Sequence, residues 1–347
     1  YLGAITLNGG ELTSDLVSPA VSGSWVFLGN VTATADSTIS AENINVGLAS
    51  ASRDFNVAAG KVLTFSGSYA DAVPVTGVSS LSKSGSGTLV MSGSTKTYTG
   101  TTTVTGGLLK FADQAQLGLS AATVHANLVF NGGAIEYTGT GAFGRKFLVK
   151  DGGAGFHATS GNPLLVNGAD QIDFDDTAPA TATSRPLTLS GTSILDNTYS
   201  AGLLQGGDAA QAFSSIVKNG VGQWIIDGAG STLAPNAEVN VNGGVLGFYL
   251  NALGGPSSTG NVNLADSSTL RWEATNNQDL GSRLKVADGA TATIKFDHTT
   301  SATTFTGGMN FGTGALVKSG AGDLVLAAAN TFSGGLTVAQ GKVTVSD

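Results

Sequence analysis

The stretch that decides the fold reads LVKSGAGDLVL at residues 316–326, where an apolar strand ending in a lysine precedes two glycines and a second apolar strand. The same order occurs in LSKSGSGTLVM at residues 81–91 and in IVKNGVGQWII at residues 216–226. The shared motif residues are Lys83, Gly85 and Gly87, then Lys218, Gly220 and Gly222, and finally Lys318, Gly320 and Gly322. Because these copies form an internal repeat, the sequence predicts a repetitive architecture.

Each copy continues into short alternating strands that are separated by glycine-containing turns. This pattern predicts an all-β fold. Sandwiches and barrels do not need an internal repeat of about 100 residues, and propeller blades repeat at about 40 to 50. A solenoid adds coil after coil, so the sequence predicts a right-handed parallel β-helix, or β-solenoid, with roughly 23 residues per coil.

We expect one continuous solenoid built from three modules. These comprise residues 1–113, residues 114–250 with an insertion, and residues 251–347. Only Asp208–Ile216 reads as a possible short helix, because Thr, Val and Gly disfavour helices elsewhere. Both ends of the sequence read as core-type strands, so we expect further repeats of the chain or another copy to stack on them end to end.

Composition narrows the classes of function. Charged residues make up 12% of the 347 residues, 51 residues are glycine, and the formal net charge is −8. A nucleic-acid partner is not expected, because phosphate binding needs clustered Lys and Arg. The chain has no cysteine, which excludes disulfides and thiolate metal sites. No apolar run approaches the roughly 20 residues that cross a bilayer, so we expect no membrane span in this segment.

The repeated lysine precedes a Gly-x-Gly turn in every copy. A lysine at a coil corner can extend its ammonium into water, so we expect Lys83, Lys218 and Lys318 to be solvated and a Lys318→Ala change to be well tolerated. A ladder of lysines that binds glycans is the alternative. The residues expected to point into the core of the third copy are Leu324, Leu326 and Val338.

The best candidate for chemistry is the acidic run DQIDFDD at residues 170–176. Strand alternation places Asp173 and Asp175 on one side, where together with Asp176 they could bind Ca²⁺ or act as acid and nucleophile. We favour a solvated loop or strand edge for this run. No cofactor is expected, and calcium is the alternative.

The Lys-x-Gly-x-Gly motif resembles the autotransporter-associated β-strand repeat, or passenger-associated repeat, which occurs in autotransporter passenger domains and in large secreted bacterial surface proteins. The copy at residues 316–345 follows the family pattern most closely. Its matching residues are Lys318, Gly320, Gly322, Leu324, Leu326, Asn330, Thr331, Phe332, Gly334, Gly335, Thr337, Val338 and Gly341. The copy that begins at residue 216 departs from the pattern at residues 233–235.

This resemblance implies a secreted or surface-exposed β-helix at the outer surface of a Gram-negative-type bacterium, and it implies no activity. The expected function is therefore a non-enzymatic structural or adhesive segment that forms a stalk or fibre of stacked β-coils. Two alternatives stay open. One is an adhesin that binds surface glycans, and the other is a polysaccharide-degrading β-helix enzyme that uses Asp173, Asp175 and Asp176.

Overall fold

The computed structural model describes residues 1–14, 25–42, 44–46, 51–71, 78–119, 127–159, 161–175, 185–203, 212–228, 233–299 and 301–346. Within these ranges the regular structure is β-strand, apart from the 3₁₀ turn η1 at Gln114–Leu117. The chain divides into two compact units, Tyr1–His157 with Gln171–Ala182, and Ala158–Asp170 with Thr183–Asp347. The three-module division stays a prediction.

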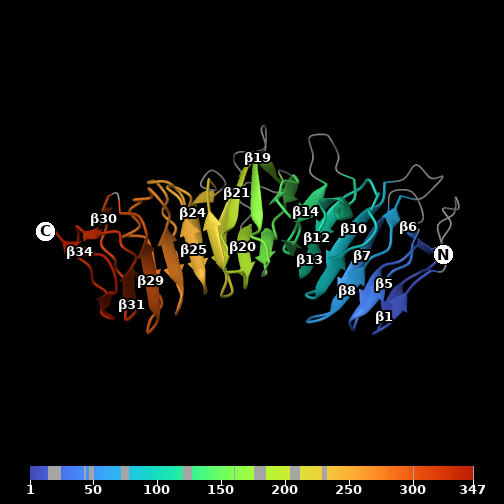
Figure 1. The fold of residues 1–347 in the computed structure, drawn as a ribbon, viewed down its shortest axis with the longest axis horizontal. Helices are drawn as coiled ribbons and strands as arrows, with labels where there is room; N and C mark the ends of the chain where they lie inside the picture. The colour runs from blue at the N-terminus through green and yellow to red at the C-terminus, as the bar shows by residue number, and fades with distance from the viewer. Residues whose placement is uncertain are drawn as a thin grey trace. The chain divides into compact units, whose positions relative to one another are not determined.

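The first unit is a stack of coils whose strands pair in parallel with the same strand of the next coil (Figure 1). One sheet orders β1 (Ile5–Leu7), β4 (Val31–Ala33), β7 (Ser52–Val57), β10 (Ser80–Ser84), β12 (Thr102–Val104), β14 (Leu128–Phe130) and β17 (Phe147–Val149). A second sheet orders β2 (Glu11–Leu12), β5 (Ser37–Ile39), β8 (Val62–Phe65), β11 (Thr88–Met91), β13 (Leu108–Phe111), β15 (Ala134–Tyr137) and β18 (Ala154–Ala158). A shorter sheet orders β3 (Trp25–Phe27), β6 (Ile44–Val46) and β9 (Tyr69–Ala70).

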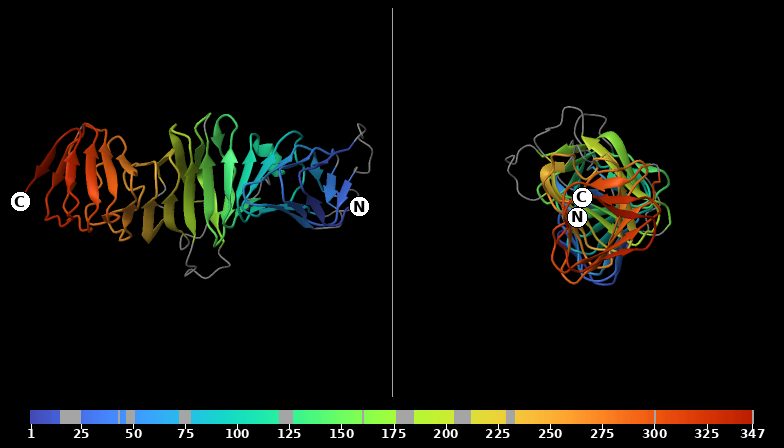
Figure 2. Two further views of the ribbon diagram at one scale, coloured as in Figure 1. Left: turned by 90° about the horizontal axis from the view of Figure 1, so that it is seen from below. Right: turned by 90° about the vertical axis from the view of Figure 1, so that its left-hand side faces the viewer.

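The second unit has the same organisation, and its orange and red coils lie side by side in Figure 2. One sheet orders β21 (Asn197–Leu203), β23 (Gln223–Ile226), β25 (Val245–Phe248), β27 (Thr269–Trp272), β29 (Thr291–Phe296), β31 (Ala315–Ser319) and β33 (Leu336–Val338). A second orders β20 (Pro186–Gly191), β22 (Phe213–Lys218), β24 (Leu233–Val241), β26 (Val262–Leu264) and β28 (Leu284–Val286), and a third orders β30 (Thr303–Phe305), β32 (Leu324–Leu326) and β34 (Val343–Val345). The predicted all-β solenoid is confirmed.

The core lies inside the coils, and strand residues alternate between it and the surface. Leu324 and Leu326 of β32 are buried, as the sequence predicted, while Val325 between them is partly exposed. Val338 is the register partner of the buried Lys318, so it lies on the inward-facing side as predicted, although it is 47% exposed. It lies in β33, beyond which the described part of the chain places no further coil.

Aromatic rings stack from coil to coil in the interior of the second unit. The buried Trp272 ring lies with its centroid 5.0 Å from that of Phe248 and 4.5 Å from that of Phe296. These residues hold equivalent positions in β25, β27 and β29, where they are register partners. Stacking of equivalent residues therefore binds consecutive coils through their side chains as well as their backbones.

The short helix expected at Asp208–Ile216 does not form in its described part. Residues 208–211 lie outside the described residues, whereas Phe213–Lys218 is strand β22. This strand pairs in parallel with β20 on one side and β24 on the other. Two ladders of backbone hydrogen bonds outweigh the modest local preference of an alanine-containing segment for helix.

Candidate functional site

The lysine of the first repeat lies in a cage of backbone carbonyls. Lys83 is at the end of β10, and its Nζ donates to the carbonyl oxygens of Ser84 at 2.7 Å, Gly85 at 2.9 Å and Gly106 at 3.0 Å. An ammonium group carries three N–H donors, so these three acceptors satisfy it completely. The first two belong to the turn after the lysine, and Gly106 lies 23 residues further along, in the turn of the next coil. The side chain therefore ties two consecutive coils together.

The other two repeats form the same cage. Lys218 Nζ donates to the carbonyls of Asn219 at 3.0 Å, Gly220 at 2.8 Å and Gly243 at 2.9 Å. Lys318 Nζ donates to those of Ser319 at 3.1 Å, Gly320 at 2.6 Å and Gln340 at 2.9 Å. The third acceptor lies 25 and 22 residues beyond the lysine, which agrees with the predicted coil length.

Glycine is required at two places in each cage. Gly85, Gly220 and Gly320 have φ of +69°, +73° and +75°, a conformation that a side chain disfavours. A second positive-φ glycine sits in the turn of the following coil, where a Cβ on Gly107 would lie 2.8 Å from Lys83 Nζ and one on Gly341 would lie 2.6 Å from Lys318 Nζ. The three copies share this second glycine at a nearly constant distance after the lysine, but the sequence alone did not predict its close approach to the lysine.

Solvation of the repeat lysines is the sequence-based expectation that the structure overturns. Lys83, Lys218 and Lys318 are each 0% exposed. Burial lowers the pKa of Lys83 to about 8, although the charge of Asp54 opposes the shift, and burial lowers the pKa of Lys218 to about 8 as well. A lysine in the interior cannot contact a glycan, so the glycan ladder is wrong for the same reason. The lysines hold the backbone and do not face a partner.

Other buried cations in the protein also bind backbone carbonyls. Lys96 donates to the carbonyls of Ser92 at 2.9 Å and Ser94 at 2.7 Å, and its Nζ lies 5.1 Å from the centre of the Phe65 ring. Arg283 reaches the carbonyls of two turns in the same manner. Eight of the 16 Lys and Arg residues are buried, namely Arg53, Lys83, Lys96, Arg145, Arg185, Lys218, Arg283 and Lys318.

The acidic run lies at the end of β19 (Leu165–Phe174). Asp173 and Asp175 are partly exposed and alternate with buried Ile172 and Phe174, as the strand pattern predicted. Asp175 Oδ2 is 3.2 Å from Lys150 Nζ, and Asp176 lies outside the described residues. Across the ranges that the structure describes, no three His, Cys, Asp or Glu side chains gather in a way that could hold a metal ion. Calcium binding and catalysis by this run stay predictions.

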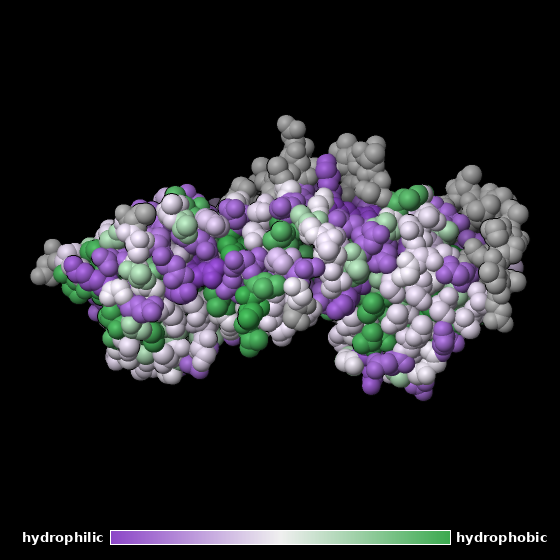
Figure 3. Space-filling model, viewed as in Figure 1, coloured by the Kyte–Doolittle hydropathy of each residue, from purple (hydrophilic) through white to green (hydrophobic). Residues whose placement is uncertain are grey.

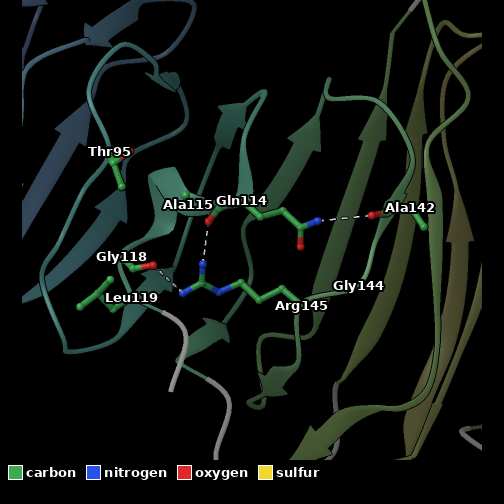
Figure 4. A pocket seen from close by; sticks show the side chains of 8 residues that line it. All are labelled: Thr95, Gln114, Ala115, Gly118, Leu119, Ala142, Gly144 and Arg145. Atoms are coloured by element: carbon green, nitrogen blue, oxygen red, sulfur yellow. Dashed lines mark hydrogen bonds between the residues drawn. The ribbon is translucent and has the colours of Figure 1, made fainter. Parts of the chain in front are cut away.

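A pocket of about 530 Å³ opens in the first unit beside η1 (Figure 4). Its lining residues are Thr95, Gln114, Ala115, Gly118, Leu119, Ala142, Gly144 and Arg145. The Gln114 amide crosses this view towards Ala142, and its Nε2 donates to the Ala142 carbonyl at 3.3 Å. No motif in the sequence predicted this pocket, because its walls come from three segments of three consecutive coils.

Arg145 is the charged group of the pocket and is itself buried. Its Nη1 donates to the carbonyl of Gln114 at 2.7 Å, and its Nη2 donates to those of Leu117 at 3.0 Å and Gly118 at 3.1 Å. Nε and Nη2 also bond Asn127 Oδ1 at 3.0 and 2.8 Å. Every one of these acceptors is a neutral oxygen. The guanidinium therefore holds the η1 turn in place, and among the described residues no carboxylate forms an ion pair with it.

Taken together, the fold and the lysine cages define a β-solenoid repeat protein. Residues 81–110 and 316–345 match the passenger-associated-transport-repeat family. These are the first and third cages with the coil turns that complete them. The middle copy forms the same cage outside the matched residues.

One relative is the adhesin BmaC autotransporter of Brucella suis biovar 1 (strain 1330), to which the chain is 34% identical over 161 residues. The match covers 43% of this chain and 4% of the relative's length. No solved structure matches the chain. None of the helical structure in the described ranges is long and apolar enough to span a membrane.

Proposed function

We propose that this chain is a structural and adhesive segment of a secreted protein at the outer surface of a Gram-negative-type bacterium, and that it has no catalytic activity. The observation that carries the structural part is the lysine cage, which occurs three times and each time joins two consecutive coils. An interaction that recurs along the chain and holds consecutive coils together is consistent with a structural role. The adhesive part and the surface location are supported by the matches to a passenger repeat and to a Brucella protein named as an adhesin.

Adhesion is tested with the purified chain on fluorescent beads. We expect these beads to bind cultured epithelial cells more than beads coated with serum albumin do. Binding no greater than that of albumin beads contradicts the adhesive part.

The absence of catalysis is tested on the same protein with a panel of polysaccharides. We expect no release of reducing sugar or unsaturated product. Product release that disappears in Asp173→Asn and Asp175→Asn variants establishes the enzyme alternative instead, because these are the carboxylates that it requires.

A further inference from the structure

We propose that the pocket around Arg145 binds the carboxylate of an acidic monosaccharide unit, such as a uronic acid, in a surface glycan. This inference rests on the adhesive part of the proposed function, and it names the ligand class and the site. It is built on the charge of Arg145, on the unused hydrogen-bonding groups around it, and on the shape and composition of the pocket wall.

Arg145 gives the pocket a positive charge. Arg145 is 7% exposed, and the hydrogen bonds of its guanidinium go to neutral oxygens. Burial lowers its pKa, but an arginine side chain stays charged in proteins. In a wall of low polarity this positive charge attracts an anion more strongly than it would in water. The pocket therefore favours a ligand with one negative charge.

Three groups of the pocket also have unused hydrogen-bonding capacity. Within the described part of the chain, one N–H of Arg145 Nη1 has no acceptor, and Gln114 Oε1 and Thr95 Oγ1 have no partner. The guanidinium offers its donor to a carboxylate, and the amide and hydroxyl oxygens suit the O–H groups of a sugar. Figure 4 shows the side chains of Gln114 and Arg145 lying next to each other.

The wall between these groups is largely apolar. Ala115, Leu119 and Ala142 supply small apolar surfaces against which the C–H face of a sugar ring can pack. A volume of about 530 Å³ lies within the range of small-ligand sites. The net charge of −8 opposes binding of long polyanions, so the site suits single acidic units.

The binding test uses two isosteric probes, methyl glucuronide and methyl glucoside, with saturation-transfer NMR on the whole chain. We expect saturation transfer to the glucuronide only, and weaker binding as salt is raised, because salt screens the charge of Arg145. Equal binding of the glucoside overturns the role of the charge. Equal binding of cyclohexanecarboxylate, a ring of similar size with one carboxylate and no hydroxyl groups, overturns the assignment to sugars, and absence of glucuronide binding overturns the whole inference.

Variants locate the site without disturbing the bonds of Arg145. Leu119 lines the pocket and is 48% exposed, so Leu119→Asp places a negative charge beside the guanidinium. We expect it to weaken glucuronide binding by about tenfold or more through repulsion. Leu28→Asp is the matched control, because Leu28 is 40% exposed in the same unit and does not line the pocket. An unchanged affinity in Leu119→Asp contradicts the location.

The bead assay separates this inference from the proposed function. If the beads bind cells but the chain does not bind glucuronide, the pocket assignment is overturned and the adhesive function is retained. Glucuronide binding that Leu119→Asp removes, together with a loss of bead binding in the same variant, supports both.

Discussion

The buried ammonium groups of Lys83, Lys218 and Lys318 each exchange water for three backbone carbonyls and have no carboxylate among those hydrogen-bond partners. At Lys218 the three contacts measure between 2.8 and 3.0 Å and belong to two turns. The tight glycine turns leave backbone carbonyls without N–H partners, and the buried ammonium needs acceptors. Each group therefore satisfies the hydrogen bonds of the other.

A Lys218→Met variant tests how much the cage stabilises the protein. Methionine keeps the apolar length of the side chain but leaves three carbonyls without their donor. We expect the free energy of unfolding in urea to fall by about 2–4 kcal/mol. Lys342→Met is the control, because Lys342 is exposed in the same unit, and it should change stability by less than about 0.5 kcal/mol. Equal effects of the two changes contradict the cage.

The pH dependence of the cage follows from the pKa of Lys218, which burial lowers from 10.5 to about 8. Below pH 8 the folded and unfolded states both carry the proton, so the contribution of the lysine is constant. Between pH 8 and 10.5 the unfolded state binds more protons, so stability must rise with pH. The difference in unfolding free energy between the unaltered protein and Lys218→Met should therefore grow by up to about 3 kcal/mol across this window. A difference that shrinks on raising the pH contradicts the shift.

The sequence predicted the lysine motif and its first glycines correctly and the surroundings of the lysine wrongly. A lysine before Gly-x-Gly reads locally as a surface corner. Its third acceptor lies 22–25 residues away and becomes visible only once the register of the coils is known. The recurring glycines at Gly107, Gly244 and Gly341 were the available signal, since a position that excludes every side chain marks a close approach.

At the scale of elements, the cage can occupy different sides of a coil. In the second unit, Lys218 ends β22 in one sheet, whereas Lys318 lies in β31 of another. Both cages nevertheless use the same two turns, one after the lysine and one in the next coil. The motif is therefore a turn-to-turn device that does not depend on which sheet its strand joins.

The second glycine of the cage gives a matched test. Gly244 and Gly289 have φ of +64° and +72°, so alanine strains the backbone at both. A Cβ at Gly289 meets nothing within 4 Å, while one at Gly244 would lie 2.7 Å from the Gly220 carbonyl and even closer to that of Gly222. We expect Gly289→Ala to cost about 1 kcal/mol of unfolding free energy and Gly244→Ala about 3 kcal/mol. Equal costs in thermal or urea unfolding would falsify the close packing.

Elements that depend on neighbouring coils were the harder ones to predict. The helix expected near Phe213 is a strand because β20 and β24 lie on either side of it. The Arg145 pocket could not be predicted from the sequence for a similar reason. Gln114 and Arg145 are 31 residues apart, and no sequence motif includes both. Alternation within a strand, as at Asp173 and Asp175, was predictable because it needs no neighbour.

At the scale of the whole molecule, burial of half the basic residues changes the charge that the surroundings meet. Glu136 is the one acidic residue that is buried among the side chains that the structure describes. The surface is therefore more acidic than the net charge of −8 indicates. The face drawn in Figure 3 is largely of intermediate hydropathy, with hydrophilic areas and with apolar groups in separate patches.

Lysine acetylation followed by mass spectrometry tests this distribution. We expect Lys83, Lys96, Lys218 and Lys318 to stay unmodified in the folded protein, because reagent cannot reach them, although their lowered pKa would otherwise make them more reactive. Lys342 should react at once. Modification of the four buried lysines at the rate of Lys342 contradicts their burial, and unfolding in urea should make all of them reactive.

Each lysine cage also has a direction, because its third acceptor always belongs to the coil on the C-terminal side. A coil whose successor has not yet folded holds an ammonium with one N–H that lacks its acceptor, and such a group is costly to bury. Growth of the solenoid towards the N-terminus places every arriving lysine on a carbonyl that is already in position. When the solenoid grows towards the C-terminus, each lysine stays hydrated until the next coil supplies its third acceptor. The partly folded intermediates of the two directions of assembly therefore differ in free energy.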